Sequence, residues 1–377
     1  MAKYKGKFEN GVDRQYDAPQ PSLAEQEEER EERGGNIALK IILITLLILL
    51  IMAAAVLAFA THYLNKINRE EIKGDMTLTH TDLLEPEEIT DEEDTTEIIE
   101  KVWQDFEAVK EMPMIETDEN VVNYLLIGCD SRDSGMAGRS DAMMVVSLNK
   151  ETKKIHITSL MRACFVVFPE GLQYPDGMLN WAFSWGGPET LIETIEMNFK
   201  IDIDHYVAVN FEAFKDVVDA MGGVEVQLTG GEAGYINTEV VSGLVGSGLQ
   251  TLNGDQALAF ARCRHAYEGD NDFRRTSRQR LLIEAMIRKV GSLGLTELTN
   301  LADTLLPAVS TDLSNAEIMA ELVNVPEYAS YEIDQMLVPV ENQAGTSFIG
   351  VMRKYGVEMY AIDWSTNLPA LEAFIKN

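Results

Sequence analysis

The longest apolar run in the chain constrains its fold more than any other feature. Residues 41–60 read IILITLLILLIMAAAVLAFA and contain no charged residue. At a rise of about 1.5 Å per residue, a helix over this run is long enough to cross a bilayer core. A cleaved signal peptide fits less well, because the run starts late and no small-residue cleavage site precedes the polar THYLNK segment. The sequence therefore predicts one retained transmembrane helix within residues 37–62.

Basic residues flank the predicted span evenly, so the charge rule leaves its orientation open. Three lie within the window before the span and three within the window after it. Residues 1–36 are polar and charge-rich, which predicts a disordered tail. The basic residues nearest the start of the chain slightly favour a cytoplasmic location for this tail.

An acidic stalk is predicted after the span, at residues 63–115. Within it, residues 81–100 carry ten carboxylates and no Lys or Arg. Apolar residues recur at helical spacing in its later part, which predicts a helix near 95–111 that docks on the following domain. Pro113 ends that helix.

Strand and helix patterns alternate over residues 116–377, which predicts a sheet covered by helices. The expected strands are 123–128, 142–148, 154–160, 205–210 and 224–228, followed by strands near 331–340 and 357–362. The expected helices are 189–199, 211–221, a short helix from Asn253-Gly254, 273–290, 297–306 and 314–323. The SWGGP segment at 184–188 is interpreted as a structural turn.

Charge and cysteine content exclude several classes of protein. The net charge of −31 disfavours nucleic-acid binding, which needs a basic surface. Cys129, Cys164 and Cys263 are too few and too scattered for a disulfide scaffold or a CxxC zinc site, and buried packing is their simplest role. The sequence also lacks a GxxxxGK[ST] loop, a GxSxG turn and an HExxH motif.

Arginines gather in one stretch of this acidic chain. Residues 262–280 read RCRHAYEGDNDFRRTSRQR, with six arginines and no lysine. Asp272 is expected to cap a helix whose Arg275, Gln279, Leu282 and Met286 share one core-facing stripe. An arginine on that stripe is unfavourable, because its charge would be buried and would face the positive end of the helix dipole. An external anion bound at the helix start would compensate both effects. With Arg262 and Arg264 on one side of an extended segment, the pattern predicts a phosphate site, since guanidinium groups bind phosphate bidentately. Arg274 and Arg280 are interpreted as solvent-exposed charges.

A second polar constellation lies at 128–144, GCDSRDSGMAGRSDAMM. Asp130 follows one predicted strand and Asp141 begins the next, so both carboxylates are expected near one sheet edge. Such a pair suits Mg²⁺, which takes one or two carboxylates together with phosphate oxygens, but turn-forming aspartates explain it equally well. Arg162, after the strand KIHITSL, adds a further phosphate contact.

Seven ordered motifs resemble the LytR-CpsA-Psr family of membrane-anchored wall-polymer ligases. They are NYLLIGCDSR, GRSDAMMVVSLN, ITSLMR, LNWAFSWGGPE, DHYVAVNFEAF, VVDAMGGVEV and LNGDQALAFARCR…DFRRTSRQ. They form a motif core over 121–290, and the pattern of 291–377 also resembles the C-terminal part of that family. The resemblance implies a three-layer α/β/α domain with a central mixed sheet outside the cell, and therefore a cytoplasmic N-terminus.

The resemblance also implies an activity and a set of partners. Such proteins transfer an anionic glycopolymer, such as teichoic acid or capsule, from undecaprenyl pyrophosphate to peptidoglycan as a phosphodiester. This is a Mg²⁺-dependent phosphotransferase reaction with pyrophosphatase activity as a side reaction. The prenyl chain is expected in an apolar tunnel. The cell membrane and wall-polymer synthesis proteins are further expected partners.

The resemblance assigns roles to individual residues. Asp130 and Asp141 correspond to the magnesium carboxylates, and together with Arg162 they form the expected catalytic set. The expected pyrophosphate contacts are Arg139, Arg162, Arg262, Arg264, Arg275 and Gln279.

The chain departs from the family where an aspartate usually follows the site arginine. Ala163 stands there instead. Smaller departures are Ala142 in place of the usual threonine, Met178 near the position of a usual lysine, and Arg274 in place of the usual glycine. The alternative hypothesis is therefore a catalytically impaired wall protein that binds polyprenyl phosphate or has a regulatory role.

Overall fold

The computed structural model describes residues 72–84, 94–130, 138–241, 243–264, 266–267, 271–342, 345–346 and 348–377, without the side chains at 295, 299, 315, 319, 322, 323, 341, 342, 345 and 346. All of them belong to one compact unit, Tyr63–Asn377. None of the helices in these ranges combines the length and apolar character needed to cross a membrane. The span predicted at 37–62 and the tail predicted at 1–36 lie outside the described residues.

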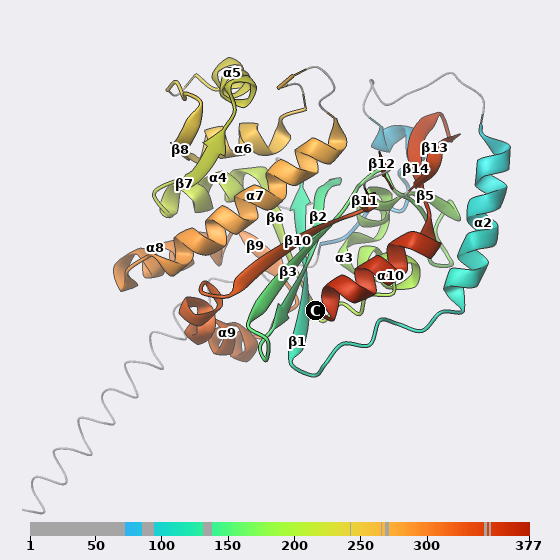
Figure 1. Ribbon diagram of the computed structural model, residues 1–377, viewed down its shortest axis with the longest axis horizontal. Helices are drawn as coiled ribbons and strands as arrows, with labels where there is room; N and C mark the ends of the chain where they lie inside the picture. Colours follow the sequence, from blue (N-terminus) through green and yellow to red (C-terminus); the bar gives the residue numbers. More distant parts are fainter. Residues whose placement is uncertain are drawn as a thin grey trace, which may run out of the picture. The chain divides into compact units, whose positions relative to one another are not determined.

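A six-stranded sheet forms the centre of the unit (Figure 1). Its strands, in spatial order, are β10 (Glu332–Val338), β3 (Lys154–Leu160), β2 (Ser140–Asn149), β1 (Val121–Cys129), β6 (His205–Asn210) and β9 (Val309–Thr311). The β1–β6 and β3–β10 pairs are parallel, whereas the other three pairs are antiparallel. The predicted central mixed sheet is therefore confirmed.

One face of the sheet packs against α3 (Leu179–Phe199) and α10 (Trp364–Ile375), and α2 (Thr96–Lys110) packs on these helices from outside. Side chains alternate along a strand, so one face of β1 carries Leu125 and Ile127 and the same face of β2 carries Met143 and Val145. These side chains share one core with Trp181 and Trp185 of α3 and with Leu368 and Leu371 of α10.

The other face is covered by α7 (Asp272–Gly291) and α9 (Asn315–Tyr328), and beyond them by α4 (Phe211–Ala220), α6 (Gly254–Arg262) and α8 (Leu295–Leu305). Met144 of β2 and Ile157 of β3 form a core there with Ile283 and Ile287 of α7. Helices thus cover both faces of the sheet. The predicted helices 211–221, 273–290, 297–306 and 314–323 are all present within a few residues at their ends.

The described residues also form four two-stranded sheets and helix α5 (Gly230–Glu239). The sheets pair β4 (Phe165–Val167) with β5 (Asp176–Met178), β7 (Val224–Leu228) with β8 (Gly248–Leu252), β11 (Glu341–Asn342) with β12 (Gly345–Thr346), and β13 (Phe348–Lys354) with β14 (Val357–Ile362). Helix α5 lies between β7 and β8 in the chain. A core of its own joins β7, α4, α5 and α6.

The described part of the predicted stalk packs on this unit. Ile72 and Leu83, the latter in the 3-10 helix η1 (His80–Leu83), are buried in the core beside α3. Val102, Phe106 and Val109 of α2 are buried in the same core, as expected for the helix near 95–111. Residues 72–84 are thus part of the folded domain and not a free stalk.

The predicted turn at SWGGP is present as a break within α3. The helix runs from Leu179 through this segment and is kinked at Gly187, whose φ is +70°. A Cβ at Gly187 would lie 2.4 Å from the carbonyl oxygen of Ile72, so glycine also lets residues 72–84 approach the helix. The turn signal thus corresponds to a local break at Gly187, with helix on both sides of it.

Candidate functional site

A cavity of about 840 Å³ lies between the sheet and the helices on its α7 face. Its walls come from β1, β2 and β6 on one side and from α4, α6, α7 and α8 on the other. The interior is aliphatic and the polar residues lie at the ends of β1 and β2 and the start of α7. The aliphatic and aromatic lining includes Leu126, Met144, Val207, Val209, Phe214, Val217, Leu258, Leu282, Ile283, Met286 and Leu305. The polar lining includes Asp130, Asp141, Arg162, Arg262, Arg264, Arg275 and Gln279.

Asp141 reaches this cavity because of an irregularity between β1 and β2. The register shifts between Gly128, which pairs with Ala142, and Cys129, which pairs with Ser140. Asp141 is the extra residue, so it shares the cavity side with Ala142 although alternation alone would place them on opposite faces. Asp130 follows β1, and its backbone N–H donates to the Arg139 carbonyl at 2.9 Å. The two carboxylates predicted at one sheet edge therefore line one cavity.

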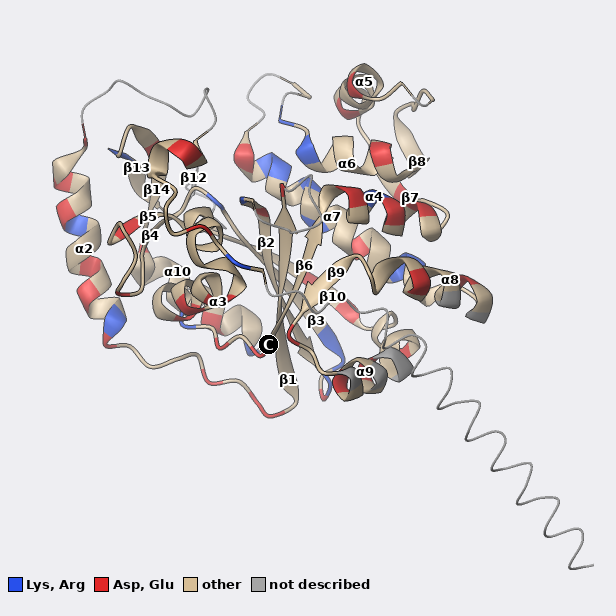
Figure 2. Ribbon diagram, turned by 180° about the vertical axis from the view of Figure 1, so that it is seen from behind, with Lys and Arg blue, Asp and Glu red and all other residues tan. Residues whose placement is uncertain are grey.

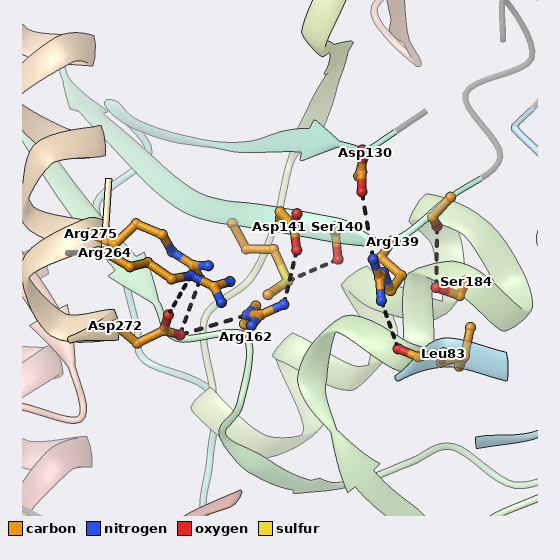
Figure 3. A network of polar contacts seen from close by, with 12 residues as sticks. Leu83, Asp130, Arg139, Ser140, Asp141, Arg162, Ser184, Arg264, Asp272 and Arg275 are labelled. Carbon is orange, nitrogen blue, oxygen red and sulfur yellow. Dashed lines mark hydrogen bonds and ion pairs between the residues drawn. The ribbon is translucent and has the colours of Figure 1, made fainter. Parts of the chain in front are cut away.

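Arg162 joins that sheet edge to α7 (Figure 3). It lies just after β3 and is only 7% exposed. Its Nη1 is 3.2 Å from Asp141 Oδ1, and its Nε is 3.6 Å from Asp272 Oδ2. A buried guanidinium between two carboxylates is held in a fixed orientation at the polar end of the cavity, which we call its mouth.

Asp272 is the carboxylate on which the arginines converge (Figure 3). Arg275 Nη2 lies 3.1 Å from its Oδ2, and Arg264 Nε lies 3.6 Å from its Oδ1, in addition to the Arg162 contact. The predicted N-cap at Asp272 is wrong by one residue, because Asn271 caps the helix by accepting from the Arg274 N–H. Asp272 is thus freed to face the arginines from the first turn, where the helix dipole also favours a carboxylate.

Arg275 is the most deeply buried of the converging arginines, at 4% exposure. Burial lowers its pKa to about 10, although Asp272 opposes this effect, so the guanidinium stays charged at neutral pH. Gln279, Leu282 and Met286 line the cavity along the same helix. This confirms the predicted stripe, with its polar start at the mouth and its apolar continuation inside.

The segment carrying Arg262 and Arg264 is less extended than predicted. Arg262 is the last residue of α6, and its guanidinium lies over the Phe211 ring at 5.2 Å. Cys263 has extended backbone angles and is fully buried, whereas Arg262 and Arg264 both line the cavity. The predicted separation of the cysteine from the two arginines is therefore present, although only part of the segment is extended.

Arg139 is the one predicted phosphate contact that does not line the cavity. Its Nη1 donates to the Leu83 carbonyl at 3.1 Å, and its Nη2 lies 3.6 Å from Asp130 Oδ2. Figure 3 shows it below Asp130 and apart from the arginines around Asp272. Arg139 therefore meets the site through Asp130.

Two arginines beside the site are buried. Arg278 is 2% exposed and donates to Glu232 Oε1 at 2.7 Å and to the Cys263 carbonyl at 2.8 Å. Arg280 is also buried, at 9% exposure, which corrects its interpretation as a solvent-exposed charge. Arg274 is exposed as expected, with its guanidinium 5.5 Å from the Tyr267 ring centre. Figure 2 shows Lys and Arg positions gathered where α6 ends and α7 begins.

The three cysteines are free and fully buried, as the packing interpretation expected. Burial raises the pKa of the Cys129 and Cys164 thiols, so neither forms a thiolate readily.

The carboxylates at the mouth fit a magnesium ion in number and kind. No cluster of three or more His, Cys, Asp or Glu side chains suited to a metal occurs among the described residues. Mg²⁺ nevertheless usually takes only one or two carboxylates and completes its shell with water and phosphate oxygens. Asp130 and Asp141, both partly exposed and on one cavity, supply such a pair.

Charge at the mouth is arranged to receive an anion. Arg162, Arg262, Arg264 and Arg275 line the cavity together with the carboxylates of Asp130, Asp141, Glu239 and Asp255, and Asp272 contacts three of these arginines. In this arrangement Asp272 keeps like-charged guanidinium groups together. A bound anion with several oxygens can also hold these guanidinium groups together, because each guanidinium group binds phosphate bidentately.

Sequence reasoning did not assign Asp272 to the site. Because an acidic residue ahead of a helix is a common helix cap, Asp272 was interpreted only as the cap of its own helix. The stronger signal was its position among arginines at a helix start, since a carboxylate is needed wherever several arginines are buried together.

Comparison with known proteins gives consistent matches. The LytR_cpsA_psr family profile matches residues 85–362. A polyisoprenyl-teichoic acid–peptidoglycan teichoic acid transferase TagU from Enterococcus faecalis is 34% identical over 230 residues, which cover 59% of this chain and 71% of that protein.

Solved structures share the fold. One, described as a transcriptional regulator from Enterococcus faecalis, has a TM-score of 0.55 at 27% identity and covers 68% of this chain and 87% of its own. The LytR-CPS2A-psr family protein YwtF (TagT) with bound octaprenyl pyrophosphate has a TM-score of 0.53 at 23% identity and covers 69% and 91%.

Proposed function

This chain belongs to the LytR-CpsA-Psr family, and from that premise we propose that it transfers an undecaprenyl-pyrophosphate-linked anionic glycopolymer to peptidoglycan as a phosphodiester. The TagU relative is named for transfer of teichoic acid to peptidoglycan, and a protein of the same fold binds octaprenyl pyrophosphate. The chain is accordingly a transferase acting on polyprenyl-linked polymers.

One observation carries this proposal. A single cavity combines an arginine-rich mouth with an aliphatic interior. A polyprenyl pyrophosphate has the complementary form, with a polyanionic head and a long apolar tail. Arg162, Arg264 and Arg275, already gathered around Asp272, would hold the head, while Leu282 and Met286 line the space for the tail.

The transfer itself requires little covalent chemistry from the protein. The acceptor hydroxyl oxygen forms a bond to the phosphorus that carries the glycopolymer, the bond from that phosphorus to the bridging oxygen breaks, and polyprenyl phosphate leaves. Asp130, partly exposed at the mouth, would take the hydroxyl proton. Arg162 and Arg275 would stabilise charge that develops on the phosphate oxygens.

Asp130 and Asp141 would also hold Mg²⁺, which when bound neutralises phosphate charge. Arg139 would act on this pair indirectly, by fixing Asp130.

Ala163 leaves a second function open. Its side chain packs at the core, and its carbonyl accepts from the Tyr360 N–H at 2.8 Å. A protein that binds polyprenyl phosphate without catalysis would retain the arginine site and lose this carboxylate. The contacts of Arg162 with Asp141 and Asp272 favour catalysis, because this arginine is oriented without a carboxylate at 163.

We place the domain outside the cell, behind a single span with a cytoplasmic N-terminus. The net charge of −31 argues against nucleic acid as a partner of the chain.

The test is turnover of a short-chain prenyl pyrophosphate by the full chain in detergent with Mg²⁺. Wild type should release prenyl phosphate, and Arg275→Ala should lower the rate by about 100-fold or more, as for loss of an oxyanion-stabilising donor. Unchanged turnover in Arg275→Ala would refute the site assignment. An inactive wild type together with an active Ala163→Asp variant would support the binding protein instead.

A further inference from the structure

The segment between α5 and β8 exposes the most solvent-accessible large apolar side chains of the described residues. Val241 is 102% exposed, Leu244 is 86% exposed and Leu249, at the start of β8, is 62% exposed. Single exposed apolar residues are ordinary on a protein surface, but a concentration of aliphatic side chains in one short segment indicates a contact surface. We call these three side chains the apolar rim.

The backbone that carries the apolar rim is held in place. The Asn237 side chain accepts from the Val245 N–H at 2.8 Å and donates to the Val245 carbonyl at 2.9 Å. Val245 is buried in the core of α4, α5 and α6, and Gln256 Nε2 donates to the Gly243 carbonyl at 3.2 Å. These contacts fix the segment from the inside, so the exposure of Val241 and Leu244 is built into the fold.

One member of the apolar rim, Val241, borders the cavity described above. Val241 lines that cavity although it is fully exposed, so it lies at the edge of the opening. Tyr235, Glu239 and Val240, which precede it in the chain, line the same cavity. A long apolar ligand that enters the aliphatic interior on this side passes the apolar rim.

We propose that the apolar rim inserts into the surface of the lipid bilayer, so that the prenyl chain passes from the bilayer into the cavity without crossing water. The inference rests on the proposed function, which supplies the prenyl ligand. The domain stays near the membrane, because the nine residues between the predicted span, ending at 62, and Ile72 can extend at most about 32 Å. Residues 240–249 contain no Lys or Arg, so insertion depends on apolar contact and not on anionic lipid headgroups.

A lipid-borne quencher tests the contact directly. The full-length Leu244→Cys variant is labelled with an environment-sensitive fluorophore and reconstituted in phosphatidylcholine vesicles, the three native cysteines being buried. Val351→Cys on β13, whose parent side chain is 39% exposed, is the matched control at the opposite end of the unit (Figure 1).

The label at 244 should shift to shorter wavelength and be quenched by spin-labelled lipid, at low and at high salt, whereas the label at 351 should not. Equal quenching at both positions would overturn the proposal. A blue shift without lipid quenching would also overturn it, because the apolar rim would then be covered by protein, either a partner or a second copy.

A second measurement connects the contact to lipid entry. In Leu244→Asp, turnover of a long-chain prenyl pyrophosphate in vesicles should fall about tenfold, while turnover of a soluble short-chain substrate should be unchanged. An equal effect on both substrates would contradict the proposal. If wild type turns over neither substrate, the proposed function fails, and the quenching result still decides whether the apolar rim meets the membrane.

Discussion

Replacing Asp272 with asparagine should destabilise the ligand-free protein and increase its stabilisation by pyrophosphate. The substitution keeps the shape of the side chain and removes the negative charge facing Arg162, Arg264 and Arg275. Three guanidinium groups would then lie together without that charge at the start of α7. Bound pyrophosphate would supply the missing charge.

The magnitude follows from the contacts. Breaking a buried ion pair costs about 3–5 kcal/mol, and the lower end applies because the Asp272 side chain keeps 16% exposure. Only the 3.1 Å contact with Arg275 has hydrogen-bond length, and the asparagine oxygen can still accept it, which returns about 1 kcal/mol. The net loss is about 2 kcal/mol, or a decrease of about 3 °C in Tm for a domain of this size.

Thermal unfolding of wild type and Asp272→Asn, with and without inorganic pyrophosphate, measures both effects. A ligand at a hundred times its Kd stabilises a protein by about 2.7 kcal/mol, so the effect of pyrophosphate should be readily measured. The Tm difference between the two proteins should shrink as pyrophosphate is added. Equal Tm values without ligand, or equal shifts with it, would refute the view that Asp272 holds the arginines together for an anion.

Three further outcomes follow from other contacts. Arg278→Met should lower the free energy of unfolding in urea by about 3–5 kcal/mol, because it leaves the Glu232 carboxylate buried without its partner, and a loss below about 1 kcal/mol would contradict this. Burial lowers the pKa of His156 from the usual 6.5, so the unfolded chain binds the proton more readily. Stability should therefore fall as the pH drops below 6.5, and His156→Asn should weaken that dependence; an unchanged profile would exclude His156 as its source. Arg275→Lys should recover only part of the turnover lost in Arg275→Ala, since an ammonium cannot form the bidentate contact, and full recovery in the same assay would argue against it.

The fold was predicted best where a single hydrophobic periodicity, that of a strand or that of a helix, continued without interruption. Strand β3 has the predicted bounds, 154–160, and α7 differs from prediction by one residue at each end. Helix α3 was predicted only from residue 189, because the glycines and Pro188 obscured the helix before the kink. Tertiary packing against Ile72 and the sheet decides that region, and neither is visible in local sequence.

The candidate site was predicted residue by residue, but the contacts among its residues were not. Asp130, Asp141, Arg162 and Arg275 line one cavity as expected. The burial of Arg278 depends on Glu232, a residue 46 positions earlier in the chain, so no helical spacing could reveal it. Asp141 lines the cavity through a register shift that the strand pattern does not encode.

The contact between Arg139 and Leu83 has a consequence for mutational studies. The acceptor is the main-chain carbonyl of Leu83, so replacing that side chain leaves the acceptor in place. An alanine scan of residues 72–84 would therefore not detect this contact, because each alanine variant keeps the carbonyl group. Aligned sequences would not reveal it either, since any residue at 83 supplies the same acceptor. A chain shortened to residue 85, where the family match begins, would lose the contact altogether. From the side of residues 72–84, its importance can be measured only by deleting the segment or by changing the backbone chemically, whereas replacing Arg139 removes the donor.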